Sequence, residues 1–304
     1  MIALDFDNID ELKKLHSDAV IDYVKTKLSL KNIAALYQQI RLLPNIGLYP
    51  TKWDKKDYSW LKKFILADLN TLKDWVENHA DKLKFDTFKK LYKTKFSNGK
   101  ETYVDSENTY NSYTLFKKMG IKVCPYCEDE YIEEVVIDGR SKRTMEFDHF
   151  YPKGEDKYPG LAMCFYNLIP SCIKCNKLKM TNPISANPYS PNIESLTRLY
   201  PDLPVGINFE TVTESECRIS FHAQGDMILN VKNLALEQRY EQHKADVFQL
   251  LSKKQRYPLE KLKEMERSGF GTVERLTVDL FGKPRNKARG KELRTKMKED
   301  LIGY

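Results

Sequence analysis

Hydrophobic residues recur every three or four positions along much of the first hundred residues, a spacing that predicts amphipathic helices. The strongest pattern covers residues 57–78, and shorter patterns cover about 9–28 and 32–42. Proline and glycine within 44–50 predict a turn between the helices at 32–42 and 57–78. A short strand is predicted at 2–6. The expected buried stripe of the longest helix consists of Leu61, Ile65, Leu69, Leu72 and Val76.

Residues 84–96, KFDTFKKLYKTKF, mix basic and aromatic side chains and admit two interpretations. Such a mixture could stack on nucleic-acid bases and hold phosphates. The helical spacing instead favours an amphipathic helix whose apolar residues face the core. Those residues are Phe85, Phe88, Leu91 and Tyr92.

The middle of the chain changes from helical spacing to strand signals. The runs 133–137 and 144–149 flank the pair Asp138-Gly139, which predicts a β-hairpin. Residues 171–180 then predict a turn leading into a short helix. A hairpin followed by a helix makes a ββα unit.

After residue 190 the pattern mixes strands and helices. Strands are predicted at 206–213, 217–222 and 227–231, and a helix at 233–251. The fold class we expect is α+β, with the ββα unit inside a largely helical chain.

The length of 304 residues, with 41% hydrophobic and 31% charged, allows a sizeable core and about two domains. The patterns divide the chain into a helical region (1–105), the ββα region (106–190) and a mixed region with a basic tail (191–304). No apolar run approaches the ~18 residues of a membrane span, and the first residues lack the pattern of an export signal. We therefore expect a cytoplasmic protein without membrane contact.

Four of the six cysteines form two pairs with the spacing C-x2-C. Two thiolates at this spacing can bind one metal ion from a single tight turn, so two pairs predict a tetrahedral zinc site. The 44 residues between the pairs exceed the usual length of a zinc ribbon, but the entropy of loop closure rises only logarithmically with length. The expected ligands of a structural Zn2+ are Cys124, Cys127, Cys172 and Cys175, and Cys164 and Cys217 are expected to be free thiols.

Residues between and beside the cysteine pairs suit the hydrolysis of a phosphodiester. A neutral imidazole can accept a proton from water near neutral pH, and His149 fits this role. Asp148 and Asn176 supply the oxygen ligands that Mg2+ or Mn2+ prefers. Glu146 shares a strand face with Asp148 and is interpreted as solvated rather than as a further ligand. Asn167 is interpreted as a scaffold residue that holds the loop orienting His149.

The formal net charge of +7 is modest, but its distribution is uneven. Residues 252–304 hold 15 Lys and Arg against 8 Asp and Glu, which accounts for the whole excess. Such a tail could bind a phosphate backbone, although basic runs are usually solvated helix faces. Lys153 and Lys179 could likewise contact phosphate or simply be solvated. The tail residues proposed to contact nucleic acid are Arg285, Lys287, Arg289 and Lys291.

Taken together, these residues resemble the HNH, or ββα-metal, nuclease family. The resemblance covers residues 124–179 and rests on Asp148-His149, Asn167 and Asn176 occurring in order with the two cysteine pairs. It implies that His149 is the general base, that Asn167 is structural and that Asn176 holds a catalytic divalent ion. This chain has Asn rather than His at the last position, a variant that the family tolerates. The resemblance also implies products with 5'-phosphate and 3'-hydroxyl ends.

Within that family, the order CPYC, DHFYPK and YNLIPSCxxCNxxK behind a helical region is similar to bacterial anti-phage nucleases of the Septu type, which work beside an ATPase. The resemblance implies a nuclease of nucleic acid, DNA rather than RNA, with a partner protein such as an ATPase on its flanks. Cutting both strands would suggest a homodimer. Two alternatives stay open: a zinc-stabilised nucleic-acid-binding or adaptor module without catalysis, and an RNA or tRNA nuclease using the same site.

Overall fold

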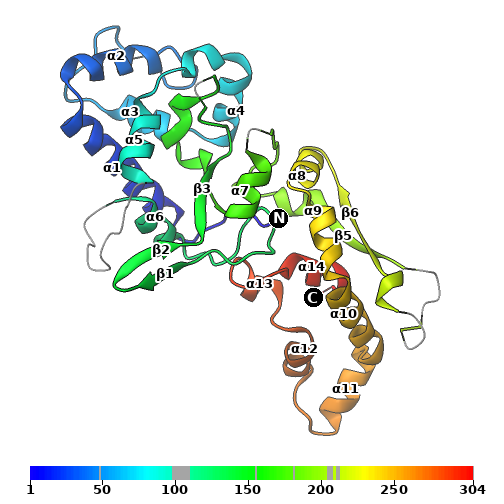
Figure 1. The fold of residues 1–304 in the computed structure, drawn as a ribbon. Coiled ribbons are helices and arrows are strands. Elements are labelled where there is room, and N and C mark those ends of the chain that lie inside the picture. Colours follow the sequence, from blue (N-terminus) through cyan, green and yellow to red (C-terminus); the bar gives the residue numbers. More distant parts are fainter. Residues whose placement is uncertain are drawn as a thin grey trace.

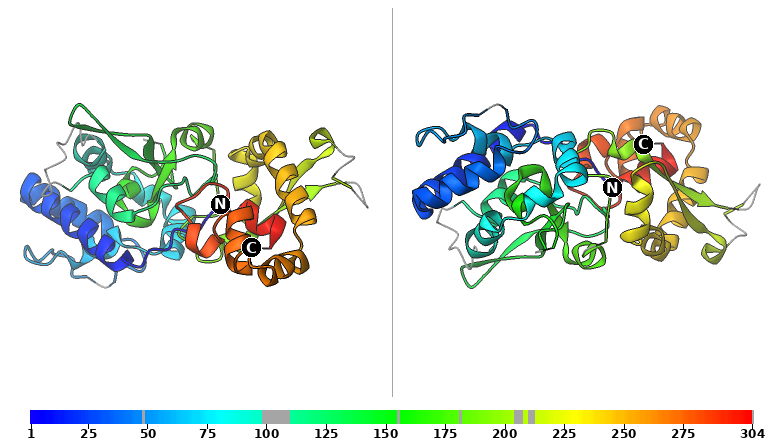
Figure 2. Two further views of the ribbon diagram at one scale, coloured as in Figure 1. Left: turned by 90° about the horizontal axis from the view of Figure 1, so that it is seen from below. Right: turned by 90° about the horizontal axis from the view of Figure 1, so that it is seen from above.

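The computed structural model describes residues 1–47, 49–97, 110–154, 156–180, 182–203, 208–209 and 213–303. The described chain forms two lobes, with the N-terminus at their junction and the C-terminus in the second lobe (Figure 1). Both views in Figure 2 show the two lobes side by side. None of the described helices is long and apolar enough to span a membrane.

The N-terminal helices form largely where the spacing predicts them. Helices α1 (Ile9–Lys27) and α2 (Leu30–Ile40) match the expected helices. The helix predicted at 57–78 is instead two helices, α3 (Ser59–Ile65) and α4 (Leu69–Asn78). The break occurs because Asp68 adopts an extended backbone and its side chain accepts a hydrogen bond from the Thr71 amide at 2.8 Å, which caps α4.

Two further segments of this lobe test the predicted pattern. Within the predicted segment 84–96, residues 87–96 are helical, forming α5 (Thr87–Leu91) and a π-helical turn (Tyr92–Phe96), and the four predicted apolar residues are buried. The strand predicted at 2–6 is wrong: these residues are buried except for Asp5, but the amides of Ile2 and Leu4 donate to the carbonyls of Pro125 and Pro188 in two different loops and make no ladder. The remaining helices of the lobe are α6 (Ser112–Met119) and α7 (Ile173–Lys179), with single turns at Ala80–Leu83, Pro159–Met163, Phe165–Asn167 and Ile193–Leu196.

The predicted hairpin forms around Asp138 and Gly139, but its second strand differs from the prediction. Strand β1 (Glu134–Ile137) pairs with β2 (Arg140–Arg143) across the two turn residues, whose φ angles are +52° and +73°. Residues 145–149 were expected to pair with 133–137 and do not.

Strand β3 (Met145–His149) instead pairs antiparallel with β4 (Leu168–Cys172), and α7 follows β4 directly. Burial explains this choice of partner. Every residue of β4 is buried and only Glu146 of β3 is exposed, whereas the tip of the β1–β2 hairpin is exposed. The site is therefore built on strand β3, its partner β4 and helix α7, which occur in this order along the chain.

One hydrophobic core spans the predicted regions 1–105 and 106–190. Trp60 and Trp75 from the helices belong to the same cluster as Phe147 and Phe165 from the site region. The described residues of the two predicted regions therefore share one core in one lobe. A second, smaller core begins close to the predicted boundary at 190 and contains Leu199, Cys217, Ile219, Tyr240, Val247, Leu251, Met297 and Leu301.

The second lobe combines one two-stranded sheet with short helices. Strand β6 (Arg218–Ala223) confirms the strand predicted at 217–222 and pairs with β5 (Thr197–Asp202). The strand predicted at 227–231 is wrong, because these residues form α8 (Met227–Asn233). The side chain of Asn230 in α8 accepts a hydrogen bond from the Ala186 amide and donates one to the Ala186 carbonyl. The strand predicted at 206–213 lies mostly outside the described residues.

The helix predicted at 233–251 is interrupted at Ala235, where φ is +49°. Helices α11 and α12 form an arm that projects from the second lobe (Figure 1). The helices after the interruption are α9 (Leu236–Tyr240), α10 (Lys244–Arg256), α11 (Leu259–Arg267), α12 (Val273–Phe281), α13 (Arg285–Ala288) and α14 (Thr295–Ile302), with a turn at Glu241–His243.

Candidate active site and metal centre

The two cysteine pairs meet where β4 passes into α7. Cys172 ends β4 and Cys175 lies in the first turn of α7, while the first pair comes from the loop after α6. All four sulfur atoms are buried and lie within 4.8 Å of one another. Tetrahedral zinc, with Zn–S bonds of ~2.3 Å, holds its sulfurs ~3.8 Å apart. The separation of 4.0 Å between the Cys127 and Cys172 sulfurs is close to that value.

Each of the four sulfurs also accepts a hydrogen bond from an N–H group. Hydrogen bonds of this kind offset the negative charge of metal-bound thiolates and fix their orientation. The donor set therefore fits a structural zinc ion. The donors to Cys124, Cys127, Cys172 and Cys175 are, in that order, the amides of Cys172 (3.3 Å), Asp129 (3.4 Å) and Cys175 (3.3 Å) and the guanidinium of Arg239 (3.1 Å).

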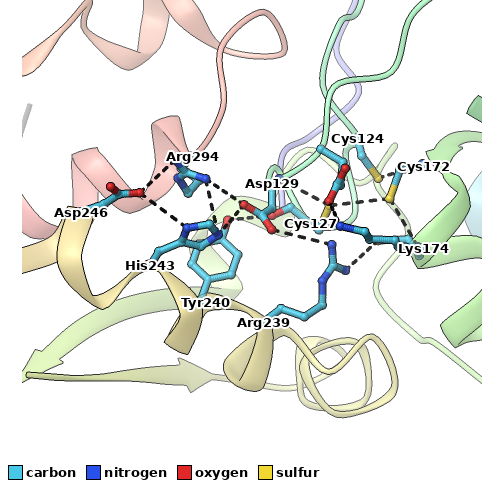
Figure 3. A network of polar contacts seen from close by, with 12 residues as sticks. Cys124, Cys127, Asp129, Cys172, Lys174, Arg239, Tyr240, His243, Asp246 and Arg294 are labelled. Carbon is cyan, nitrogen blue, oxygen red and sulfur yellow. Dashed lines mark hydrogen bonds and ion pairs between the residues drawn. The ribbon is translucent and has the colours of Figure 1, made fainter. Parts of the chain in front are cut away.

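A network of charged side chains joins this cysteine cluster to the second lobe, as Figure 3 shows. Asp129 lies 3.0 Å from Arg294, 2.7 Å from His243 and 4.0 Å from Arg239. Asp246 adds a second carboxylate at 3.1 Å from Arg294. Because Arg239, His243 and Arg294 belong to the second lobe, the network holds that lobe against the cysteine loop.

His149 ends β3 and is buried, with its two ring nitrogens in different surroundings. Nε2 lies 3.1 Å from the Ala162 carbonyl, which can only accept, so Nε2 carries the proton. Nδ1 then carries the lone pair, which accepts a hydrogen bond from the Lys153 ammonium at 3.0 Å. Burial, followed by the charge of Lys153, lowers the pKa of His149 well below its usual 6.5. The imidazole is therefore neutral near pH 7, as a general base requires.

Asp148 precedes His149 and its carboxylate is held by two donors. The Tyr126 hydroxyl donates to Oδ2 at 2.7 Å, and the Lys179 ammonium donates to Oδ1 at 3.1 Å and lies equally close to Oδ2. Lys179 also donates to the His149 carbonyl at 2.7 Å and is 0% exposed. Lys179 is thus the buried ion-pair partner of Asp148, and its predicted contact with phosphate, which would require this ion pair to open, stays a prediction. Each carboxylate oxygen keeps a second lone pair that a cation could use.

Asn176 on α7 reaches across to the strand that carries Asp148. Its amide N–H donates to the Glu146 carboxylate, while its amide oxygen makes no hydrogen bond to a described residue. Glu146 is exposed, as interpreted from the sequence, yet it borders the same cavity as Asp148 and Asn176. Carboxylate and amide oxygens are the donors that Mg2+ and Mn2+ prefer, so this set of residues fits a divalent cation.

Asn167 makes the hydrogen bonds expected of a scaffold residue. It is fully buried, its side-chain oxygen accepts from the Tyr151 amide at 2.7 Å, and its side-chain N–H groups donate to the carbonyls of Leu161 (2.9 Å) and Tyr151 (3.2 Å). The Phe150 amide donates to the Asn167 carbonyl at 3.0 Å. Asn167 thus ties the loop after His149 to the segment that carries Ala162, the partner of Nε2.

A cavity of about 470 Å³ opens beside these groups, and we call it the His149 cavity. Lys153 is half-buried at its wall, where burial lowers the pKa of its ammonium below the usual 10.5. The position of Lys153 therefore agrees with the predicted phosphate contact. The lining residues are Tyr92, Ser97, Arg143, Glu146, Phe147, Asp148, His149, Pro152, Lys153, Gly154, Asn176 and Met180.

The basic tail is arranged differently from the prediction. Arg285 is buried and lies 3.0 Å from Glu194 and 2.7 Å from Glu299, and Arg289 lies 2.9 Å from Glu194. These two arginines are paired with carboxylates of the chain, so their predicted contact with nucleic acid, which would compete with these ion pairs, stays a prediction. Lys287 and Lys291 are exposed, and Lys287 is 3.3 Å from Glu274, so a contact of these two lysines with nucleic acid stays a prediction.

Three residues of the site were missed in the sequence analysis. Tyr126, whose hydroxyl donates to Asp148, is the first of them. Its place between the two cysteines of the first pair indicates that it is buried near the site. The ring of Tyr92 lies edge-on to His149, with centroids 4.4 Å apart, and Tyr92 was expected only in the core. Arg143 borders the His149 cavity and donates to the Ser97 carbonyl at 3.1 Å, and no sequence pattern marks it.

Comparison with known protein families gives no match, and no solved structure matches either. A stretch of 71 residues is 38% identical to the Septu protein PtuB of Bacillus thuringiensis. This match covers 23% of the chain and 24% of the relative, so the two proteins are similar over about a quarter of their lengths. The chain is therefore similar in part to a Septu protein, and it has a buried four-cysteine cluster that could hold a metal such as zinc.

Proposed function

We propose that this chain is a metal-dependent HNH endonuclease that hydrolyses phosphodiester bonds of nucleic acid, with double-stranded DNA as its substrate. The observation that supports this most is the environment of His149. Its Nε2 is fixed by a backbone carbonyl, and among the described residues its Nδ1 is hydrogen-bonded only to the ammonium of Lys153, at the wall of a polar cavity.

A comparison within the chain supports a chemical role for His149. His16 is also fully buried, but both of its ring nitrogens are bound, to the Tyr110 hydroxyl at 2.5 Å and to the Met163 carbonyl at 2.7 Å. That arrangement is what a structural histidine needs. His149 differs because its Nδ1 becomes available as soon as an anion in the cavity attracts Lys153.

The residues of the cavity then divide the work of hydrolysis. His149 Nδ1 accepts a proton from the attacking water while the bond from phosphorus to the leaving oxygen breaks. Lys153 binds a phosphate oxygen, and Lys179 and Tyr126 hold Asp148 in place. Asp148 and Asn176 would hold the divalent ion, Mg2+ or Mn2+, which would offset negative charge in the transition state.

The four cysteines would hold a structural Zn2+ that fixes β4 and α7 relative to the loop after α6. The zinc would then lie at the Cys172 end of β4, where Cys172 pairs with Met145. Leu168, at the other end of β4, pairs with His149. The zinc would act on the geometry of the site and not on the reaction.

The partial similarity to a Septu protein supports a role in anti-phage defence together with a partner protein such as an ATPase. Action in the cytoplasm and assembly as a homodimer belong to the same proposal. None of the described residues after 196 borders the His149 cavity, so the second lobe is the part of the chain that we propose for contact with a partner.

The experiment that tests this function is a cleavage assay with plasmid DNA and single-stranded RNA in the presence of Mg2+, Mn2+ or EDTA. The wild-type chain should cut DNA only with a divalent ion, and His149→Ala should lower the rate by ~10²–10⁴-fold, the usual contribution of a general base. The matched control is His222→Ala, an exposed histidine of the second lobe. Equal cutting by wild type and His149→Ala would refute the proposal, and cutting of RNA alone would establish an RNA nuclease.

A further inference from the structure

A second cavity, of about 420 Å³, is lined in part by residues 150–152 of the loop that follows His149. We call it the tyrosine cavity because Tyr151 and Tyr158 form part of its wall. Pro152 lines both this cavity and the His149 cavity, so the two spaces adjoin at one residue. Along the loop, His149 and Lys153 border the first cavity and Tyr151 borders the second.

The two tyrosines present a corner to the tyrosine cavity. Their ring centroids are 6.2 Å apart and their planes cross at 83°. A flat ligand can therefore stack on the face of one ring while its rim meets the other. Both rings are half-buried, and neither phenol makes a hydrogen bond to another described residue, so both hydroxyls remain available to a ligand. Aromatic side chains of this kind are the usual platforms for nucleic-acid bases.

The charges around the tyrosine cavity are balanced. Its lining holds two lysines, Lys73 and Lys157, and two carboxylates, Glu77 and Asp226, and Lys73 lies 3.9 Å from Glu77. Two positive and two negative groups do not select an anion such as phosphate. They suit a neutral ligand that both donates and accepts hydrogen bonds, since carboxylates accept from exocyclic amino groups and lysines donate to ring nitrogens or carbonyl oxygens. A nucleobase has this combination of flat shape and mixed donors and acceptors.

The position of Tyr151 is coupled to that of His149 through the backbone. Asn167 binds both the amide and the carbonyl of Tyr151, at 2.7 and 3.2 Å. The Cα atoms of Tyr151 and His149 are two residues apart and so at most ~7 Å from each other. The ring of Tyr151 is therefore carried by a backbone segment that is fixed beside His149, the residue that would act as the general base.

We propose that the tyrosine cavity is a subsite for one unpaired nucleobase of the strand that is cut, next to the scissile phosphate. The inference rests on the proposed function and specifies its substrate. Bases within a duplex are stacked and paired, so the subsite requires a strand that is already open or a base that is flipped out. A mismatched, bulged or single-stranded segment satisfies this requirement at the smallest energetic cost.

The test measures binding by the full-length His149→Ala chain, so that cleavage does not interfere. The probes are a DNA strand made entirely of abasic residues and the same strand with a single 2-aminopurine, whose fluorescence falls on stacking. Because only one base is present, it can occupy the subsite in any register. The strand with the base should bind about tenfold more tightly, within the range found when one aromatic stacking partner is removed.

Variants of Tyr151 distinguish the stacking of an aromatic ring from the mere size of the side chain. Tyr151→Leu in the same background should abolish both the difference in affinity and the fluorescence change, whereas Tyr151→Phe should retain them. Tyr131→Leu, at a tyrosine that is 51% exposed and borders neither cavity, is the matched control and should change nothing. Equal binding of the two strands, no binding of either strand, or a difference that persists in Tyr151→Leu would overturn the inference.

Cleavage by the chain with His149 intact reports on the proposed function separately. If plasmid DNA is cut but the two probe strands bind equally, only the base subsite is refuted. If nothing is cut but binding depends on Tyr151, the hydrolytic function is refuted and the base subsite is retained.

Discussion

Replacement of Asn167 by alanine should destabilise the first lobe more than any single change at its surface. The asparagine is fully buried and satisfies three backbone groups, namely the Tyr151 amide and the carbonyls of Leu161 and Tyr151. A buried polar group left without a partner costs ~1–3 kcal/mol. The Tyr151 carbonyl, with the longest bond, contributes least, so the free energy of unfolding should fall by about 3–6 kcal/mol.

The assay is urea unfolding followed by tryptophan fluorescence, because Trp60 and Trp75 are buried in the same core. The matched control is Asn187→Ala, a buried asparagine that bonds the Tyr166 carbonyl at 3.0 Å and the Tyr189 amide at 2.9 Å, away from the His149 loop. This control should lose about 2–4 kcal/mol, because two backbone groups lose their partner.

The two asparagines should differ in their effect on cleavage. At a temperature where both variants are folded, Asn167→Ala should cut more slowly because the loop that orients His149 is released, and Asn187→Ala should cut at the wild-type rate. The reasoning is refuted if Asn167→Ala unfolds at the wild-type urea concentration, or if the two variants cut equally fast.

Two further predictions concern buried charges. Lys179→Met should lower the free energy of unfolding by about 3–5 kcal/mol, because it leaves Asp148 buried without its cation. Lys177→Met, at an exposed position of the same helix, should change it little, and equal urea midpoints would contradict this prediction. Burial lowers the pKa of His16 from 6.5 to about 4, so the unfolded chain binds the proton more readily. As the pH falls from above 6.5 towards 4, protonation of this histidine should therefore lower the free energy of unfolding by about 3 kcal/mol. His16→Gln should reduce that pH dependence and His222→Gln should not, as measured by urea unfolding at pH 7 and pH 4.5.

Local spacing was enough to predict the cysteine cluster and the helices that border it. Cys124, Cys127, Cys172 and Cys175 were identified because two ligands of one turn must be three residues apart, whatever the rest of the fold does. Helix α7 and the hairpin turn at Asp138 and Gly139 follow from similarly local signals. The role of Asn167 came from the family resemblance, and its hydrogen bonds agree with it.

Features that depend on distant partners could not be predicted in this way. Residues 145–149 carry the same strand signal whether they pair with 133–137 or with 168–172, and burial in the assembled core decides between them. Lys179 and Arg285 look like solvated cations in the sequence. Their carboxylate partners, Asp148 and Glu194, are 31 and 91 residues away along the chain, so only the folded arrangement reveals them.

We propose that Asp148 and Asn176 hold a divalent ion in the His149 cavity and that the chain cuts nucleic acid with this ion. The most direct measurement is the single-turnover rate of DNA cleavage in Mg2+ for Asp148→Asn and Asn176→Ala, with zinc content determined on the same samples. We predict that both variants retain the zinc of wild type and cut at least about a hundredfold more slowly, because the ion contributes several kcal/mol to the transition state. Asn182→Ala, at an exposed asparagine beyond the cavity, should cut at the wild-type rate. Wild-type rates in Asp148→Asn and Asn176→Ala would contradict the account.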